Sequence, residues 1–569
     1  MMQGSVDVLV IGGGGAACRA AVAAADAGAK VAMVLKGKLG RSGATAYKVA
    51  EMAGFNVADA QADPLDSPEE HYRDIMQAAY SMADPKLARV VAEEAPQALQ
   101  KLVEWGVPFE RDGDHYLEFT SCFSNRPRTH VIKGHGEPII EALVREIRKR
   151  AIAVYEDCQV TNLFIKDGRC VGAGILDEDG VFHALAAGAV VLATGGAGQL
   201  FARNLNPLDI CGDGYTLGYE AGAQLINMEF MQAGLGISYP IVNLLNAWIW
   251  SARPVLTNRL GEPVLERYLP PDITPETVMD AHARHFPFSS ADPSRYIEIA
   301  VQSEIAAGRG TDEGGVYLDL TRITDAYLNS LPPEDAFRKM WPITQDFLSA
   351  RGVDVAKQKI QIACFGHAIN GGLRIDASGA TTVPGLFAAG EVAGGPHGAD
   401  RLGGNMMVTC QVFGARAGRA AAAEGRNRER REIPATLVAE EEARLKARAG
   451  RAVDVAALKA RLQQAAQTHL LVRRSEAGLR EFLNTICLLR EEIKAAPAAA
   501  PSRRVWDLQS LLTVGELMAT AARVRRESRG SHFRADYPER DDENFGRPFA
   551  ISRGSAGPDL VPYEFEAKR

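Results

Sequence analysis

The most constraining feature of the sequence is its first 35 residues, which alternate in a strand–turn–helix–strand pattern. The continuous apolar run Val6–Ile11 is typical of a strand that is buried on both faces. Gly12, Gly14 and Ala17 then occupy the three positions of a GxGxxA turn, and an alanine-rich helix leads to a second strand, Lys30–Leu35. Glycines in such a turn let the backbone approach a pyrophosphate, and the helix N-terminus supplies amide donors. The pattern predicts a dinucleotide-binding unit, with a purely structural turn as the alternative.

A second stretch near residue 390 supplies a group that this unit lacks. An acidic residue often follows the second strand of such units, but Leu35 and Lys36 stand there. The late apolar strand Gly385–Ala389 runs into Glu391, and a glycine-broken loop then leads to a helix of small residues. A charged group at a strand end, beside a loop that a ligand can approach closely, suits a nucleotide cofactor. We therefore predict that Glu391 holds the ribose.

The segment between these two stretches has a different composition. From residue 237 to 351, Pro, Trp, Tyr and charged residues interleave and strong strand patterns disappear, which indicates an inserted α+β domain. After Gly425 the apolar spacing is helical over 434–449, 455–473, 476–495 and 505–527, whereas the chain from residue 528 reads as polar and irregular. The predicted fold is α/β: a discontinuous Rossmann-like domain (1–236 and 352–430), an inserted domain (237–351), and a C-terminal helical domain with its tail (431–569).

Composition excludes several classes of function. The net charge of −7 gives no basic surface for nucleic acid. The eight cysteines are scattered singly without a CxxC pair, which excludes the usual spacings for an iron–sulfur cluster, a c-type haem or a zinc ribbon. We therefore expect no metal site. No apolar run is long enough to span a membrane, so we expect a cytoplasmic protein, although such a protein can still dock on a membrane complex.

Many segments of the chain together match one known family. The matching segments are Val10–Ala17, Arg41–Thr45, Ala193–Gly198, Gly212–Gly214, Met228–Phe230, Gly366–Gly372, Gly385–Glu391, His397–Asn405 and Glu527–Asn544. They resemble the flavoprotein subunits of succinate dehydrogenase and fumarate reductase, a family that also includes L-aspartate oxidase and the adenylylsulfate reductase flavoprotein subunit. The resemblance extends nearly from end to end and keeps the family's order.

This resemblance implies FAD in an extended pose and an active site between the FAD domain and a mobile capping domain. The predicted cofactor-binding residues are Gly12, Gly14, Ala17, Lys36, Ser42, Gly43, Ala44, Thr45, Thr194, Gly195, Asp213, Glu391, Gly403, Asn405 and Met406. Members of the family transfer a hydride between flavin N5 and a carbon next to a carboxylate.

The resemblance also assigns catalytic roles. His367 and Arg401 match the pair that clamps a substrate carboxylate, and Arg295 matches the arginine that donates a proton. Tyr296 replaces the aspartate that follows this arginine in the family. The chemistry agrees, since a hydride acceptor must be polarised and the arginine fork suits a carboxylate. The alternatives are a satisfied core histidine at 367 and ordinary surface arginines at 295 and 401.

Two departures from the family pattern limit the comparison. The early loop Arg41–Thr45 has no histidine, so we expect FAD to be bound non-covalently. The His-Pro-Thr that holds a second carboxylate in the dicarboxylate enzymes is missing after Met228–Phe230, where an apolar, glycine-containing stretch continues to Ile237. An apolar wall does not offset the desolvation of a second carboxylate. We therefore expect a small unsaturated or saturated carboxylic acid other than plain fumarate; a rearranged dicarboxylate pocket is the alternative.

Electrons must be exchanged with another molecule, because the chain carries no cluster or haem motif. A separate iron–sulfur or reductase protein is the expected partner, and the sequence leaves the oligomeric state open. Two other readings keep the flavin. One is an adenylylsulfate-reductase-like or L-aspartate-oxidase-like flavoprotein, and the other is a non-catalytic electron-transfer flavoprotein.

Overall fold

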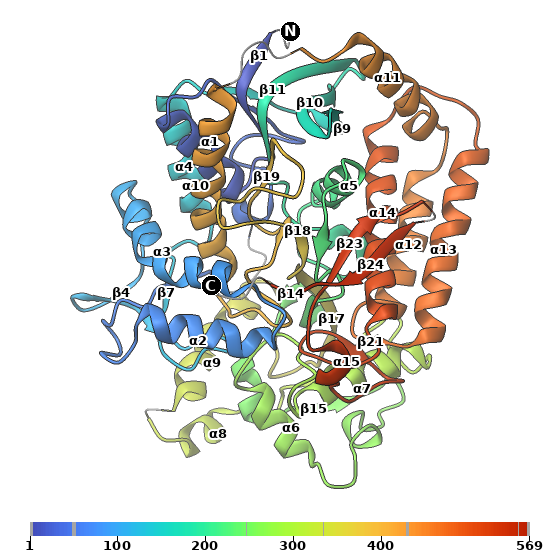
Figure 1. The fold of residues 1–569 in the computed structure, drawn as a ribbon. Coiled ribbons are helices and arrows are strands. Elements are labelled where there is room, and N and C mark those ends of the chain that lie inside the picture. Colours follow the sequence, from blue (N-terminus) through green and yellow to red (C-terminus); the bar gives the residue numbers. More distant parts are fainter. Residues whose placement is uncertain are drawn as a thin grey trace.

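The computed structural model describes residues 4–47, 53–245, 247–333, 335–427, 432–555 and 557–565. Its N-terminal part is built on a mixed seven-stranded sheet in the order β8-β2-β1-β11-β10-β9, with β19 pairing with β11 (Figure 1). The strands are β1 (Ser5–Ile11), β2 (Val31–Val34), β8 (Ala153–Tyr155), β9 (Gln159–Lys166), β10 (Arg169–Leu176), β11 (Phe182–Leu192) and β19 (Leu386–Ala388). The pairs β8–β2, β2–β1, β1–β11 and β11–β19 are parallel.

The parallel strands place four predicted cofactor residues along one edge of this sheet. Gly12 follows β1, Lys36 follows β2, Thr194 follows β11 and Glu391 follows β19. In open α/β sheets, ligands bind outside the carboxyl ends of the strands. The early and late halves of the sequence therefore build one binding edge, as a discontinuous domain requires.

Helices α1 (Gly15–Asp26) and α10 (Asn405–Arg426) pack tightly against each other beside the sheet. Small residues permit the close approach, since a Cβ at Gly418 would lie 2.2 Å from the carbonyl oxygen of Ala20. Other helices of this part are α2 (Pro68–Ala79), α3 (Pro85–Glu104), α4 (Glu137–Lys149) and α5 (Asp213–Glu220). A three-stranded sheet, β3 (Gly54–Asn56), β7 (Thr129–Val131) and β6 (Glu118–Phe119), lies next to the start of α10.

The inserted segment forms the lower part of Figure 1 and has its own sheet, in the order β14-β13-β17-β16-β15. Its strands are β13 (Met231–Tyr239), β14 (Asn243–Leu244), β15 (Val255–Thr257), β16 (Val316–Asp319) and β17 (Ile360–Ile369), and its helices are α6 (Pro275–His282), α7 (Arg295–Ala306), α8 (Asp325–Ser330) and α9 (Ala336–Ser349). The boundary predicted between residues 236 and 237 falls inside β13, which is one continuous strand. We call the part of the chain from β13 to β17 the cap.

The C-terminal part is helical, with α11 (Ala435–Ala449), α12 (Val455–His469), α13 (Glu476–Ala495) and α14 (Arg503–Val524). Figure 1 shows α12, α13 and α14 side by side on the right. The boundary predicted between residues 430 and 431 lies outside the described residues. Among the residues that the structure describes, every helix is too short or too polar to cross a lipid bilayer.

The tail departs from the polar, irregular segment that the sequence predicted. Strand β23 (Phe549–Arg553) pairs with β12 (Leu225–Ile226), and β24 (Pro558–Pro562) completes a sheet with β18 (Gly372–Arg374) and β20 (Ala393–Gly394). Three of the tail's titratable residues are buried, Arg529, His532 and Arg534, together with Arg525 and Glu527 just before it. The mixed architecture with a helical C-terminal part confirms the predicted α/β fold class.

Candidate active site

One large cavity, of about 490 Å³, lies between the edge of the seven-stranded sheet and the cap. Most of the predicted site residues line it: Gly12, Gly14, Lys36, Ser42, Gly43, Ala44, Thr45, Thr194, Gly195, Asp213, His367, Glu391, Arg401, Gly403 and Met406. Ala17, Arg295 and Asn405 do not line it. The strand ends and the late glycine loop thus meet at a single site.

The glycine turn after β1 leaves room for a ligand. Gly12 has φ +124°, and a Cβ there would lie 2.2 Å from the carbonyl oxygen of Ala193, so the protein itself requires glycine. A Cβ at Gly14 would meet nothing closer than 3.9 Å, so the space beside it is open. Gly14 is the N-cap of α1 and provides no side-chain cap, so the first amides of the helix and the positive end of its dipole are available to a ligand. Ala17 is fully buried in α1, where a small residue allows helix and strand to pack closely.

Five buried polar atoms on residues that line the cavity have no hydrogen-bond partner among the described residues: Ser42 Oγ, Gln159 Oε1, Thr194 Oγ1, Asp209 Oδ1 and Asp213 Oδ1. A buried polar atom without a partner destabilises the fold by roughly 1–3 kcal/mol, so such atoms point to a missing ligand. Together with the open turn at Gly14, they fit the polar groups of a dinucleotide such as FAD.

Glu391 and Lys36 occupy opposite ends of this edge. The Glu391 carboxylate accepts a hydrogen bond from the Ile369 amide at 3.0 Å, and burial raises its pKa to about 7. Lys36 Nζ lies 2.5 Å from Asp213 and 2.8 Å from Asp507 on α14. Burial alone would lower the pKa of Lys36, but the two carboxylates raise it well above its ordinary value. Lys36 therefore stays charged and ties the C-terminal helices to the cofactor edge.

Asn405 lies behind the cavity wall, at the first residue of α10. Its Oδ1 accepts from Asn56 Nδ2 at 2.8 Å and lies 3.0 Å from His71 Nε2. Asn56 Nδ2 also donates to the Gly403 carbonyl at 2.7 Å. In this structure Asn405 supports the junction between the loop at Gly403 and the start of α10, where Met406 lies, rather than facing the cavity.

Arg401 brings a positive charge to the cap side of the cavity. Its guanidinium donates to Gln232 Oε1 at 3.0 Å and to the Leu402 carbonyl at 2.9 Å, both of which are neutral. Within the described part of the chain, no carboxylate forms an ion pair with it. Burial lowers the pKa of Arg401 and the Glu391 charge opposes this, but a guanidinium remains protonated at neutral pH. A buried cation with only neutral partners favours an anionic ligand.

His367 reaches the cavity through a β-bulge. Gln232 pairs with Ala368 and Ala233 pairs with Gly366, so His367 is the extra residue of β17 without a partner on β13. Such bulges re-aim a side chain, often beside active sites. Burial and the nearby Arg401 lower the pKa of His367 to about 3, so its ring is neutral at physiological pH. A neutral imidazole beside Arg401 can donate one hydrogen bond to a carboxylate.

Aromatic side chains from the cap lie beside this pair. A Cβ at Gly234 would lie 2.3 Å from the Phe286 ring, so that ring occupies the space where a side chain at position 234 would project. Phe286 also packs edge-to-face on His367, with ring centroids 5.9 Å apart. Trp248 lines the cavity too, whereas Trp250 is fully buried and Tyr239 is exposed. Sequence reasoning missed Phe286, because it comes from a cap loop without a recognisable motif.

The structure does not bring the predicted proton donor to the cavity. The Arg295 guanidinium donates to the Ser290 carbonyl at 2.6 Å and to the Tyr296 hydroxyl at 3.2 Å. Two charged cap residues that are candidates to relay a proton to Arg295 are also engaged elsewhere, since Glu298 pairs with His282 at 2.7 Å and Arg253 pairs with Asp280 at 2.9 Å. A different cap arginine, the exposed Arg284, lines the cavity. The proton-donor role of Arg295 stays a prediction.

The chain is similar in sequence and in structure to several known proteins. The FAD binding domain family model matches residues 7–407, and the fumarate reductase flavoprotein C-terminal model matches residues 459–560. One fumarate reductase (CoM/CoB) subunit, from Methanothermobacter marburgensis, is 34% identical, and the alignment covers 94% of each chain. L-aspartate oxidase of Caulobacter vibrioides is 31% identical with the same coverage. The solved structure of Mycobacterium smegmatis Sdh1 in complex with UQ1 has a TM-score of 0.85 at 30% identity, covering 100% of this chain and 95% of that one.

Proposed function

This chain belongs to the succinate dehydrogenase and fumarate reductase flavoprotein family, and we propose that its substrate presents one carboxylate to Arg401 and a neutral end to the cap. It is an FAD-dependent oxidoreductase of the class that acts on CH–CH groups. When bound, FAD supplies hydride transfer at its N5 atom. The residues along the sheet edge would hold the cofactor, and side chains on the cap side of the cavity select the acid.

The residues that would bind the carboxylate end of the substrate are better defined than those that would contact its other end. Arg401 offers the charge and His367 a neutral donor, and both line the cavity. A carboxylate held by such a pair withdraws electrons from the neighbouring carbon–carbon bond, which favours hydride attack on an alkene. We propose that these two residues bind and orient the carboxylate.

The observation that carries the proposal is the position of Phe286. Its ring fills the space above Gly234, close to where the family's dicarboxylate enzymes place a histidine for the second carboxylate. A carboxylate pressed against this ring would lose hydration without gaining a hydrogen bond. An unsaturated acid with an apolar or otherwise neutral end fits this wall better.

A second candidate is a dicarboxylate such as fumarate. The name of the Methanothermobacter relative favours it, and so does Arg284, an exposed cation on the cavity wall. In that reading Arg284 would hold the second carboxylate from the cap. The two candidates differ in the charge at the far end of the substrate, which an experiment can vary directly.

We expect the pre-reduced protein to be reoxidised by monocarboxylic enoates at least about tenfold faster than by fumarate in single-turnover absorbance measurements, because burying an unpaired carboxylate costs well over 1 kcal/mol. The panel should include oxidised aspartate (iminosuccinate), to cover the aspartate-oxidase reading. Phe286→Ala, which empties the space above Gly234, should reduce the difference between the reoxidation rates with enoates and with fumarate. Fumarate reacting as fast as the enoates would favour the second candidate. Failure of every acid, together with rapid oxidation by a partner protein, would support a non-catalytic electron-transfer flavoprotein.

FAD is expected to be non-covalently bound. The loop residues Ser42–Thr45 that line the cavity include no histidine, but His135 lies elsewhere on the same wall. After acid precipitation we expect a colourless pellet and a yellow supernatant. A yellow pellet would show a covalent link, and the His135→Ala variant would then identify whether that histidine carries it.

We propose a separate electron-carrying partner, because the eight cysteines are free and dispersed through the fold. The Methanothermobacter relative is named as one subunit of its enzyme, which supports a multi-protein arrangement. The cytoplasmic location stays a prediction.

A further inference from the structure

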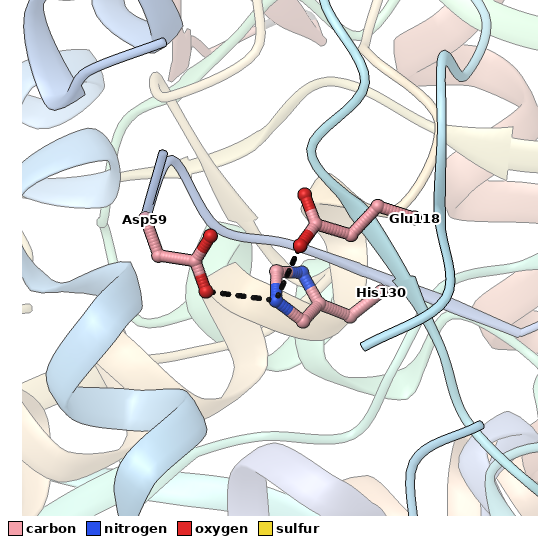
Figure 2. Close-up of side chains that lie close together, drawn as sticks. All are labelled: Asp59, Glu118 and His130. Carbon is pink, nitrogen blue, oxygen red and sulfur yellow. Dashed lines mark hydrogen bonds and ion pairs between the residues drawn. The ribbon is translucent and has the colours of Figure 1, made fainter. Parts of the chain in front are cut away.

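We propose that Asp59, Glu118 and His130 form a binding site for a divalent transition-metal ion, separate from the flavin cavity. Figure 2 shows the three side chains converging, with Asp59 and Glu118 both directed at the imidazole ring of His130. The sequence predicted no metal site, because these residues lie far apart in the chain and match no ligand spacing.

The small sheet β3-β7-β6 positions two of the ligands. His130 on β7 pairs directly with Glu118 on β6, and such opposite residues point to the same face of a sheet. Asp59 follows β3, the strand on the other side of β7. Thr129, the neighbour of His130, lines the flavin cavity, so His130 faces the opposite side by the alternation of a strand. The site therefore lies behind the sheet that forms part of the cavity wall.

The separations of the ligand atoms suit one small ion. His130 Nε2 lies 3.1 Å from an Asp59 oxygen and 3.6 Å from Glu118 Oε1. Ligands bound to one ion at about 2.0–2.2 Å stand roughly 3–3.6 Å apart. All three ligand atoms lie within 4.8 Å of one another. Asp59 is the more exposed of the two carboxylates, so its side chain has more freedom to adjust to an ion.

The orientation of His130 leaves its Nε2 atom facing two anions. Its Nδ1 lies 3.2 Å from the Arg128 carbonyl, where it donates its proton to that oxygen. Metal-binding histidines commonly fix their second nitrogen in this way. In the neutral ring, Nε2 is then a hydrogen-bond acceptor that faces two other acceptors, the carboxylate oxygens of Asp59 and Glu118. A cation bound between the three atoms would attract all of them. A second proton on the ring is the competing explanation.

Glu118 supplies an independent sign of a missing partner. Its side chain is 2% exposed, yet Oε1, the oxygen nearest His130, has no hydrogen bond among the described residues. A buried carboxylate oxygen without a donor is destabilising, and such oxygens are held by hydrogen bonds or by metals.

The donor set indicates the class of ion. One imidazole and two carboxylates suit Zn²⁺, Mn²⁺ or Fe²⁺, whereas Ca²⁺ and Mg²⁺ prefer oxygen ligands alone. The Asp59 side chain is 17% exposed, which provides a path for entry and a place for a water ligand. Bound there, the ion would fasten the loop after β3 to β6 and β7 and so stiffen one wall of the flavin cavity.

The test uses the FAD-loaded protein after dialysis against a chelator, with Zn²⁺ as the probe in calorimetric titration. We expect about one equivalent to bind to the wild type and the affinity to fall at least about tenfold in Glu118→Gln and His130→Gln. The matched control is His183→Gln. His183 also contacts a carboxylate, Asp177, at 2.6 Å, but no third ligand group joins them among the described residues.

Thermal unfolding provides a second measurement. Zn²⁺ should raise the melting temperature of the wild type and of His183→Gln but not that of Glu118→Gln, since binding to the folded state alone is stabilising. Glu118→Gln keeps the shape of the side chain, and its flavin content should match the wild type. The absence of saturable Zn²⁺ binding in the wild type, or equal affinity in wild type and Glu118→Gln, would overturn the proposal in favour of a protonated His130.

Discussion

Replacing Arg401 with glutamine is expected to lower the rate at which unsaturated acids reoxidise the reduced protein by about 100- to 1,000-fold. Arg401 is buried on the cavity wall, and its two hydrogen-bond acceptors, Gln232 Oε1 and the Leu402 carbonyl, are neutral. No carboxylate of the described residues forms an ion pair with Arg401, so the substrate carboxylate would be its ion-pair partner. Glutamine keeps a polar side chain there but removes both the charge and the fork. Single-turnover absorbance with the best acid of the panel measures the effect.

Two further variants separate the role of charge from that of geometry. Arg401→Lys keeps the charge but loses the bidentate fork, so we expect an intermediate loss. Arg461→Gln is the matched control, because Arg461 is half exposed and pairs with Glu492 on the surface of the helical part. Flavin content should be unchanged in all three. A rate for Arg401→Gln within about twofold of the wild type would show that Arg401 does not bind the substrate.

The cofactor edge could be predicted from the sequence because its signals are local. The run Val6–Ile11, the glycines at 12 and 14, and the strand before Glu391 each specify their own backbone within a few residues. Parallel pairing then brings the strand ends together without further information. The same local logic explains why the four C-terminal helices begin and end near their predicted limits.

The substrate side depends on contacts between distant segments, and there local patterns were less informative. Gly234 and Gly236 weaken the strand pattern, so Met231–Ile237 read as an apolar stretch, although pairing with β17 makes it part of β13. The bulge that aims His367 and the Phe286 ring above Gly234 arise from this pairing and from the cap loop. For Arg295, the position in the sequence matches the family motif, but in the fold its guanidinium donates to the Ser290 carbonyl.

The ordered structure of the tail was not predicted from its composition either, because a charged sequence does not reveal whether its charges are paired inside the fold. Arg529 of the tail donates to Glu527 at 2.8 Å. Arg525, just before the tail, donates to the same carboxylate at 2.9 Å and to Glu229 at 2.6 Å, and all four side chains are buried. Glu229 belongs to the Met-Glu-Phe segment that identified the family. Its buried contact with Arg525 assigns it a structural role, anchoring the tail beneath the start of β13.

Glu527→Gln is therefore expected to lower the free energy of unfolding by about 3–5 kcal/mol, the usual effect of removing one partner from a buried ion pair. The Glu527 carboxylate is fully buried and accepts from Arg525 Nη1 at 2.9 Å, from Arg529 Nε at 2.8 Å and from the Asp541 amide at 2.8 Å. Glutamine would leave two buried guanidiniums short of negative charge. Urea unfolding followed by tryptophan fluorescence measures the loss.

The surface pair Arg461–Glu492 provides the control, since both side chains are about half exposed and Glu492→Gln should cost under about 1 kcal/mol. The tail also contacts the active-site surroundings: Ser531 Oγ donates to the Ala399 carbonyl at 2.8 Å, and the Ser290 amide of the cap donates to the Gly530 carbonyl at 2.7 Å. Glu527→Gln should therefore release FAD at lower urea than the wild type does. Equal unfolding midpoints for the two glutamine variants would show that the buried network adds no more stability than a surface pair.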